Sequence, residues 1–181
     1  MYEHIEYDVS DNIATVFLNR PAKKNAYTPY MGMEIVAAME AAMADSDVRA
    51  VILTGRGDAF CGGVDLEFLR AHMAGEDTDP GPKLGEEHLV NGWPLDLVAY
   101  PKPVIAAING AAYGVGVTMT LGCDVRYAAA GATLGLNFTT LGVLPGLGST
   151  HHLPQLVGVG KAMELVLSGA RIPAEEACAI G

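Results

Sequence analysis

The sequence predicts an α/β fold in which short buried strands alternate with helices, and three observations support this prediction. Continuously apolar runs of five residues occur at Ala50 to Thr54 and Val104 to Ile108, a pattern typical of strands in a parallel sheet that are buried on both faces. Each run leads through glycines into a helical pattern, which indicates alternating strands and helices rather than segregated halves. With 181 residues, half of them hydrophobic, the chain fits one domain spanning residues 1–181.

The first part of the chain predicts two strands, a helix and a third strand. His4 to Asp8 and Ile13 to Leu18 are expected to be strands joined by a Ser-Asp-Asn turn. Thr28 and Pro29 occupy the positions of a helix N-cap and of the first helical residue. The apolar side chains with helical spacing, which we expect to face the core, are Ile35, Val36, Met39 and Met43. The run Ala50 to Thr54 follows as a strand.

The rest of the chain continues the alternation. Pro94 is expected to break or bend the helical stretch in which it lies. In order, the predicted elements are a glycine-rich loop at Gly55 to Gly63, a helix at Asp65 to Met73, a loop at Ala74 to Pro82, helical residues from Leu84 to Ala99, a strand at Val104 to Ile108, a helix from Gly114 to about Leu121, strands at Asp124 to Ala129 and Thr133 to Leu136, and helices at Leu147 to Leu156, Gly160 to Ser168 and from Pro173 onward.

Composition and charge exclude several classes of function. The net charge of −10 argues against a nucleic-acid partner, and there is no basic helix or long apolar run for a membrane. The three cysteines lie far apart and form no CxxC pair, so we expect neither a disulfide framework nor a metal site. Met1 to Val9 contains charges and no apolar core of a signal peptide, and a cytoplasmic location is expected.

Two segments share one design that points to a ligand site. AVILTGRGDAFCGGVDLEFL and PVIAAINGAAYGVGVTMTL each pass from a buried strand through glycines into a helix. Loops of this kind leave main-chain N–H groups unpaired at a helix N-terminus, and two such groups that converge form an oxyanion hole. Tight strand-to-helix connections without a ligand remain the alternative for this pattern.

Common nucleotide and nucleophile motifs do not fit. A GxGxxG fingerprint that begins at Gly114 meets Met119 where glycine is needed, and a P-loop that ends at Lys161 meets Gln155 and Ala162. No GxSxG nucleophile motif is present.

Several longer motifs resemble the enoyl-CoA hydratase/isomerase (crotonase) family, in their order and over nearly the whole chain. FCGGVDL is similar to the first oxyanion-hole segment of that family, PKPVIAAINGAAYGVGVTMTLGCDVRYAAAGATLGLNFTTLGVLPGLGST to the second, and LNRPAKKNAY to its CoA-binding loop. The motifs LNRPAKKNA and NGAAYGVGVT resemble the isomerase branch of the family more closely than the hydratases. The resemblance implies a spiral of repeated ββα units without the C-terminal helices that complete the acyl pocket and assemble trimers in the family.

The resemblance also implies a set of site residues. The main-chain N–H groups of Val64 and Val115 correspond to the oxyanion hole, which polarises a thioester carbonyl and stabilises an enolate. The positions expected to contact the CoA thioester, which is a substrate and not a permanently bound cofactor, are Ala22, Lys23, Lys24, Gly62, Gly63, Asp65 and Gly114. From the residues alone, the two lysines fit a solvated turn equally well, and Asp65 fits a helix cap.

The expected catalytic carboxylates are missing. Hydratases of the family use two glutamates, which correspond to Thr118 and Phe138, and one branch of isomerases uses a glutamate that corresponds to Gly146. None of these three residues is acidic. His151 and His152 are alternative bases, because a neutral imidazole can accept a proton, although a polar helix start explains them as well.

The sequence therefore predicts an acyl-CoA thioester enzyme, nominally an isomerase or hydratase, that stabilises an enolate. By the resemblance it is also expected to be a homo-oligomer, a trimer or a hexamer. A non-catalytic protein or inactive partner subunit that binds CoA esters is the alternative. A serine peptidase of the related Clp type would need a serine at the start of the second glycine-loop helix, which this chain lacks.

Overall fold

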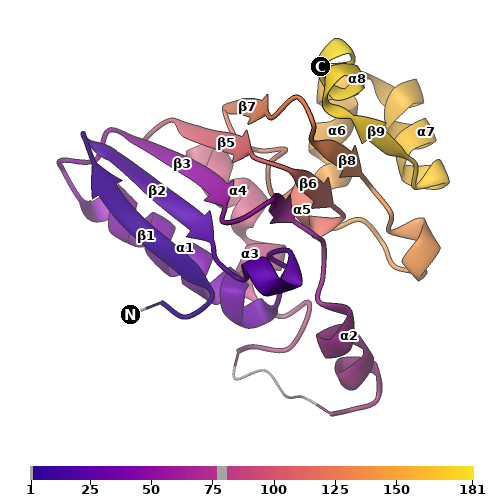
Figure 1. The fold of residues 1–181 in the computed structure, drawn as a ribbon, viewed down its shortest axis with the longest axis horizontal. Helices are drawn as coiled ribbons and strands as arrows, with labels where there is room; N and C mark the ends of the chain where they lie inside the picture. Colours follow the sequence, from indigo (N-terminus) through magenta and orange to yellow (C-terminus); the bar gives the residue numbers. More distant parts are fainter. Residues whose placement is uncertain (1, 77–80) are drawn as a thin grey trace.

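The structure, a computed structural model, describes residues 2–76 and 81–181 and confirms the α/β fold (Figure 1). One sheet has the order β1-β2-β3-β5-β7 and a second sheet has the order β4-β6-β8-β9. The strands are β1 (Ile5–Ser10), β2 (Ile13–Leu18), β3 (Ala50–Gly55), β4 (Ala59–Cys61), β5 (Val104–Ile108), β6 (Ala111–Tyr113), β7 (Val125–Ala128), β8 (Thr133–Gly135) and β9 (Arg171–Pro173).

The two sheets are built by a repeated unit. Each of the pairs β3/β4, β5/β6 and β7/β8 places its first strand in the five-stranded sheet and its second in the four-stranded sheet. Within each sheet these successive strands are parallel neighbours. Because helices follow each pair, the chain winds as a spiral of ββα units, and the predicted fold class is confirmed.

Helix α1 (Pro29–Ala44) packs one face of the five-stranded sheet. Thr28 caps it, since its hydroxyl accepts a hydrogen bond from the amide of Met31 at 3.3 Å, as the sequence predicts. The inward face is made by Met31, Ile35, Ala38, Met39 and Ala42. Inclusion of Met43 in this face was wrong, because Ala42 takes the inward position and Met43, one residue later, is 46% exposed.

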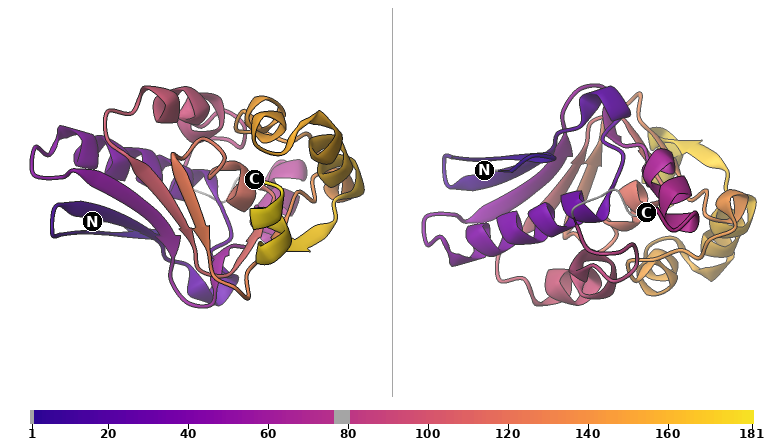
Figure 2. Two further views of the ribbon diagram at one scale, coloured as in Figure 1. Left: turned by 90° about the horizontal axis from the view of Figure 1, so that it is seen from above. Right: turned by 90° about the horizontal axis from the view of Figure 1, so that it is seen from below.

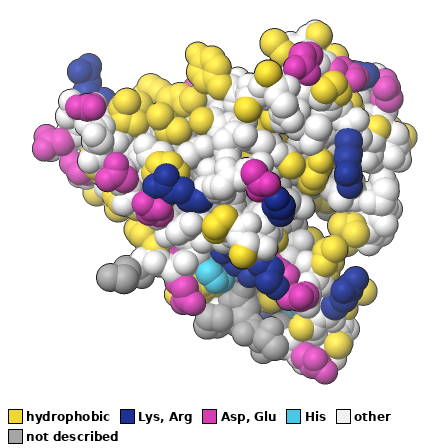
Figure 3. All heavy atoms as spheres, in the orientation of Figure 1, with side chains coloured by type: hydrophobic (Ala, Val, Ile, Leu, Met, Phe, Trp, Pro, Cys, Tyr) yellow, Lys and Arg dark blue, Asp and Glu magenta, His cyan; other side chains and the backbone are white. Residues whose placement is uncertain are grey.

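The other face of the five-stranded sheet is not covered by α1 or α4 (Trp93–Ala99), which both lie behind the sheet in Figure 1. Burial therefore alternates along β3 and β5, and the prediction that these strands are buried on both faces was wrong. Ile52, Ile105 and Val125 are aligned across β3, β5 and β7 on the open face. Hydrophobic side chains gather over this part of the surface in Figure 3.

Short strands and helix breaks account for the other differences from the sequence prediction. The strands β4, β6 and β9, of three residues each, were not predicted. Helix α5 (Val115–Thr118) ends before Leu121, and the helical stretch before β5 is divided at Gly92 into α3 (His88–Asn91) and α4. The predicted break at Pro94 is confirmed, although it falls at Gly92, because Pro94 lies in the first turn of α4, where no helical N–H bond is lost. The predicted loop at Ala74 to Pro82 lies partly outside the described residues.

The remaining helices are α2 (Leu66–Met73), α6 (Ser149–Val157), α7 (Val159–Ser168) and α8 (Ala174–Ala179). Helices α6, α7 and α8 lie at the end of the molecule far from the hairpin of β1 and β2, as both views of Figure 2 show. In the described part of the chain, every helix is too short or too polar to cross a membrane.

Candidate functional site

The two predicted glycine loops leave neighbouring strands at the same edge of the four-stranded sheet. Strands β4 and β6 are parallel, with Cys61 opposite Ala112, so their carboxyl ends lie side by side. Each then turns through a glycine with a positive φ, which is 100° at Gly63 and 52° at Gly114. Residues other than glycine rarely adopt such a positive φ, so both turns depend on glycine.

The two loops are packed against each other so closely that side chains have no room. A Cβ atom placed on Gly116 would lie 2.6 Å from the carbonyl oxygen of Cys61, and one on Gly63 would lie 3.3 Å from that of Tyr113. Cys61 itself is fully buried, and burial raises the pKa of its thiol to about 11, so it remains a neutral packing group.

The direction of the Val64 N–H group follows from its neighbours. Tyr27 donates its N–H to the carbonyl of Gly63 at 2.7 Å and accepts the N–H of Asp65 at 2.8 Å. In a trans peptide the carbonyl and the following N–H point in opposite directions, so the Val64 N–H points away from Tyr27. In the described residues it donates no hydrogen bond.

The Val115 N–H group is directed by the same peptide geometry. The carbonyl of Gly114 accepts hydrogen bonds from Val117 and Thr118, both at 3.0 Å, and therefore points along α5. The N–H of Val115 in the same peptide points out of the start of the helix. Among the residues that the structure describes, it too has no acceptor.

The three positions at which the sequence resemblance predicts family glutamates differ in their surroundings. Thr118 is 1% exposed, and its hydroxyl lies 3.4 Å from the carbonyl oxygen of Val115. The ring of Phe138 reaches the second loop, because a Cβ atom on Gly114 would lie 3.9 Å from its Cζ. A Cβ atom built on Gly146 would have no neighbouring atom of the described residues within 4 Å. An apolar ring thus lies beside the second glycine loop, at one of the positions where the resemblance predicts a carboxylate in hydratases.

The two candidate histidines lie at the start of α6 but in different settings. His151 is exposed, and its Nε2 lies 3.0 Å from Nε2 of Gln155. His152 is half-buried and packs toward Gly122, whose Cβ would lie 3.8 Å from the His152 Nε2. Burial, followed by the charges of His151 and Arg126, lowers the pKa of His152 below its ordinary value, which favours a neutral imidazole.

Replacement of His152 by glutamine should make the fold less sensitive to mild acid. Because the pKa of His152 is lower in the folded chain than the ordinary 6.5, the unfolded chain binds the proton more tightly, and stability falls as the pH drops below that value. The measurement is the loss of Tm between pH ~7.5 and ~5.5 in both proteins. An equal loss in His152→Gln would contradict this assignment.

The predicted CoA-binding lysines are both paired with acids of their own chain. Lys23 forms an ion pair with Glu67, which raises the pKa of Lys23, and Lys24 forms one with Asp58. Ala22 and Lys23 belong to the short 3-10 helix at Pro21–Lys23. Both lysine side chains remain substantially exposed, at 45% and 60%. A phosphate that approached them would have to compete with these carboxylates.

The predicted CoA-binding loop packs against the first glycine loop. A Cβ atom on Gly62 would lie 3.3 Å from the carbonyl oxygen of Lys24, and the amide of Gly62 donates to that oxygen at 2.8 Å. Asp65 caps α2 by accepting from the amides of Glu67 and Phe68.

Asp65 also forms a largely buried ion pair with Arg20 at 2.9 Å. Burial acts to raise the pKa of Asp65, but the bond from Arg20 and the two amide bonds lower it overall. Asp65 is therefore held as a carboxylate. It joins α2, which it caps, to the predicted CoA-binding loop through Arg20.

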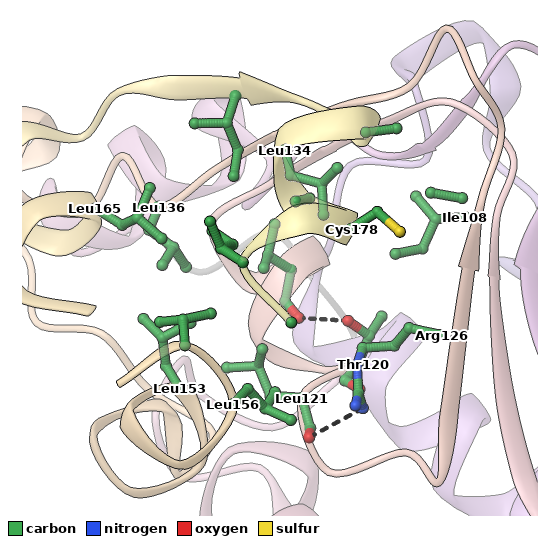
Figure 4. Close-up of a pocket in the computed structure, with 18 of the residues that line it drawn as sticks. Ile108, Thr120, Leu121, Arg126, Leu134, Leu136, Leu153, Leu156, Leu165 and Cys178 are labelled. Carbon is green, nitrogen blue, oxygen red and sulfur yellow. Dashed lines mark hydrogen bonds between the residues drawn. The ribbon is translucent and has the colours of Figure 1, made fainter. Parts of the chain in front are cut away.

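A cavity of about 500 Å³ lies beyond α5 rather than at the glycine loops (Figure 4). Two of its polar side chains already donate hydrogen bonds to the main chain. The Thr120 hydroxyl donates to the carbonyl of Val117 at 2.8 Å, and the Arg126 guanidinium donates to the carbonyl of Leu121 at 3.3 Å. The leucines that line it are Leu121, Leu134, Leu136, Leu153, Leu156 and Leu165. Neither Val64 nor Val115 borders this cavity.

Two residues near the loops were missed by the sequence analysis. Tyr27 holds the main chain on both sides of Val64, and Asn137 places its Oδ1 3.3 Å from where a Cβ of Gly114 would lie. Asn137 stands directly before Phe138, so its position next to a predicted site residue was a usable signal. Tyr27 carries no such local signal, because its role depends on pairing with a distant segment.

Known proteins resemble this chain over most of its length. Residues 8–181 match the family model described as enoyl-CoA hydratase/isomerase. The 1,2-epoxyphenylacetyl-CoA isomerase of Escherichia coli K12 is 36% identical over 179 residues, which cover 98% of this chain and 67% of that protein. The protein YngF of Bacillus subtilis 168 is 40% identical over 95% of this chain, which spans 64% of its length.

Solved structures share the fold. The enoyl-CoA hydratase subunit I of Geobacillus kaustophilus HTA426 superposes with a TM-score of 0.86 and 36% identity, covering 99% of this chain and 67% of that one. The chain thus spans about two thirds of the length of these proteins. The family model matches nearly all of the sequence, and the two-sheet spiral is the same. The chain belongs to the enoyl-CoA hydratase/isomerase family.

Proposed function

We propose that this chain binds the thioester carbonyl of an acyl-CoA between the N–H groups of Val64 and Val115. The observation that supports the proposal is that both groups, on loops in direct contact, have no acceptor within the described residues. Two N–H donors at about 3 Å from the carbonyl oxygen stabilise the negative charge that forms when a proton leaves the adjacent carbon. The reaction class is enolate chemistry on an enoyl-CoA, nominally isomerisation or hydration.

The carboxylate that usually moves the proton is absent from Thr118, Phe138 and Gly146. Loss of one general base typically costs about 10²–10⁴-fold in rate. Of the two histidines, His152 is held in the form that can accept a proton. It packs toward Gly122, seven positions beyond Val115 in the sequence. We therefore expect slow hydration of a short enoyl-CoA by this protein.

Binding of CoA esters without turnover is the second candidate function. The aromatic ring of Phe138 next to Gly114 favours it, since an apolar group there does not hold an activated water. On this reading the same two N–H groups bind the thioester, and no proton is transferred.

One experiment tests the proposal and separates the two candidates. Butyryl-CoA labelled with ¹³C at the carbonyl is titrated into the protein, and its C=O stretching frequency is followed by infrared difference spectroscopy. Because two hydrogen bonds weaken the C=O bond, the frequency of the bound ester should lie below its value in water. Turnover of a panel of enoyl-CoA esters then distinguishes an enzyme from a binding protein. An unshifted carbonyl in the saturated complex would reject the oxyanion-hole assignment.

We also propose that the chain self-associates, as a family trimer or hexamer would. Val159, Met163 and Leu167 recur on one side of α7 and are 69%, 53% and 63% exposed. Their spacing of four residues makes them a single apolar stripe, which is costly to leave in water.

Substitution of this stripe should reduce the mass of the protein in solution. Met163→Glu with Leu167→Lys places charges on the stripe and is expected to shift the species measured by sedimentation at micromolar concentration toward the monomer. Leu95→Lys, at a 73% exposed position on α4, is the matched control and should leave the mass unchanged. A monomer already in the unaltered protein would contradict the proposal.

A further inference from the structure

A buried carboxylate lies behind the first glycine loop, at Glu87. It is 1% exposed, and within residues 2–76 and 81–181 no lysine, arginine or histidine forms an ion pair with it. Its two oxygens accept hydrogen bonds from the hydroxyl of Tyr27 at 2.9 Å and from the amide of Gly85 at 2.6 Å. A buried charge needs such donors, so the link between Tyr27 and Glu87 is costly to break.

The phenol of Tyr27 is also confined by α1. A Cβ atom on Gly32 would lie 2.4 Å from the Tyr27 hydroxyl oxygen and 3.1 Å from the ring. Any larger residue there would displace the ring, so the glycine leaves the space that the phenol fills. Helix α1 and Glu87 together fix the position of the Tyr27 side chain.

The main chain of the same tyrosine holds Val64. Tyr27 bonds the residues before and after Val64, at 2.7 Å to Gly63 and 2.8 Å to Asp65, in a short parallel bridge. A shift of Tyr27 would turn both flanking peptides, and the Val64 N–H would turn with them. The position of the Tyr27 main chain is thus linked to the direction of the Val64 N–H.

We propose that Tyr27 and Glu87 are positioning residues that aim the Val64 N–H at the thioester carbonyl, an inference that rests on the proposed function. The pair acts through the main chain and does not touch the ligand. It connects α3, through Glu87, to the loop that polarises the substrate. Hydrogen-bond donors in such a site work only when their direction is fixed before the ligand arrives.

The test is Tyr27→Phe, which removes the hydroxyl and keeps the ring. With ¹³C-labelled butyryl-CoA, the lowering of the C=O frequency should fall to about half of its value in the unaltered protein, since one of two donors is no longer aligned. The Kd for the ester should change by less than about tenfold, because most contacts of the ligand remain. Tyr100→Phe is the matched control, since it removes a phenol hydrogen bond to the carbonyl of Met39 on α1 and should leave the frequency unchanged.

A second variant keeps the test decisive if Tyr27→Phe folds poorly. In Tyr27→Phe with Glu87→Leu, both partners are apolar and no buried charge is left without a donor, so the fold should be retained while the link is absent. The same loss of carbonyl shift is expected. A full shift in both variants would overturn the role of the pair and leave the proposed function standing. No shift in the unaltered protein, with the ester bound, would overturn both.

Discussion

Glutamates at Thr118 and Phe138 together are expected to raise the hydration of crotonyl-CoA by about 10²–10⁴-fold over the unaltered protein. By the family resemblance these are the positions expected to hold the two carboxylates of a hydratase, and the ring of Phe138 already lies next to Gly114. One glutamate, ionised as a carboxylate, would accept a proton from the attacking water, and the other, protonated as a carboxylic acid, would donate its proton to the α carbon. The measurement is the loss of enoyl absorbance under saturating substrate.

The matched control for this pair is Thr118→Gln with Phe138→Gln, which has nearly the same size and hydrogen-bonding capacity but no general base. Its rate should stay near that of the unaltered protein. Because Thr118 is buried, the folded fraction of each variant is measured alongside by circular dichroism. Fast hydration by the unaltered protein would contradict the prediction and direct attention to His152.

Much of the fold was predictable because its strands carry strong local patterns. The runs at Val104–Ile108 and Ile13–Leu18 form strands with the predicted bounds, and Thr28 caps α1 as expected. The strands β4 and β6 were missed, since three residues are too few to show periodicity. These short strands bring the glycine loops together, so the sequence indicated two loops without the sheet that places them side by side.

Site residues could be predicted from the sequence only where the local backbone conformation requires one type of residue. Gly63 and Gly114 have positive φ values, which favour glycine, so the glycines themselves mark these two turns in the sequence. The pairing of Tyr27 with Glu87 joins residues 60 positions apart and leaves no local pattern. The ion pairs of Lys23 and Lys24 with Glu67 and Asp58 are likewise long-range, so the sequence left the surroundings of these lysines open.

Val115→Pro is expected to lower turnover by about 10²–10³-fold, because proline has no N–H and one oxyanion donor is lost. The substitution suits its position. Val115 is the first residue of α5, where proline is tolerated, and the preceding Gly114 lacks the Cβ that clashes with a proline ring. Two measurements check this prediction. Turnover is compared with and without Val115→Pro in the protein that carries glutamates at positions 118 and 138. The carbonyl frequency of bound butyryl-CoA is compared with and without Val115→Pro in the protein that carries no other substitution.

Val159→Pro is the matched control, because Val159 is also the first residue of a helix, α7, and also follows a glycine. Val159 belongs to the exposed apolar stripe of α7 and lies outside the glycine loops, so this control is compared with the unaltered protein after the mass of both in solution has been measured, and it should leave turnover and the carbonyl frequency unchanged. If Val115→Pro folds normally and keeps the full carbonyl shift, the oxygen is held by other donors, and the Val115 amide does not belong to the hole. If the shift falls to about half while Kd changes little, the N–H of Val115 acts on the carbonyl charge rather than on binding of the CoA ester.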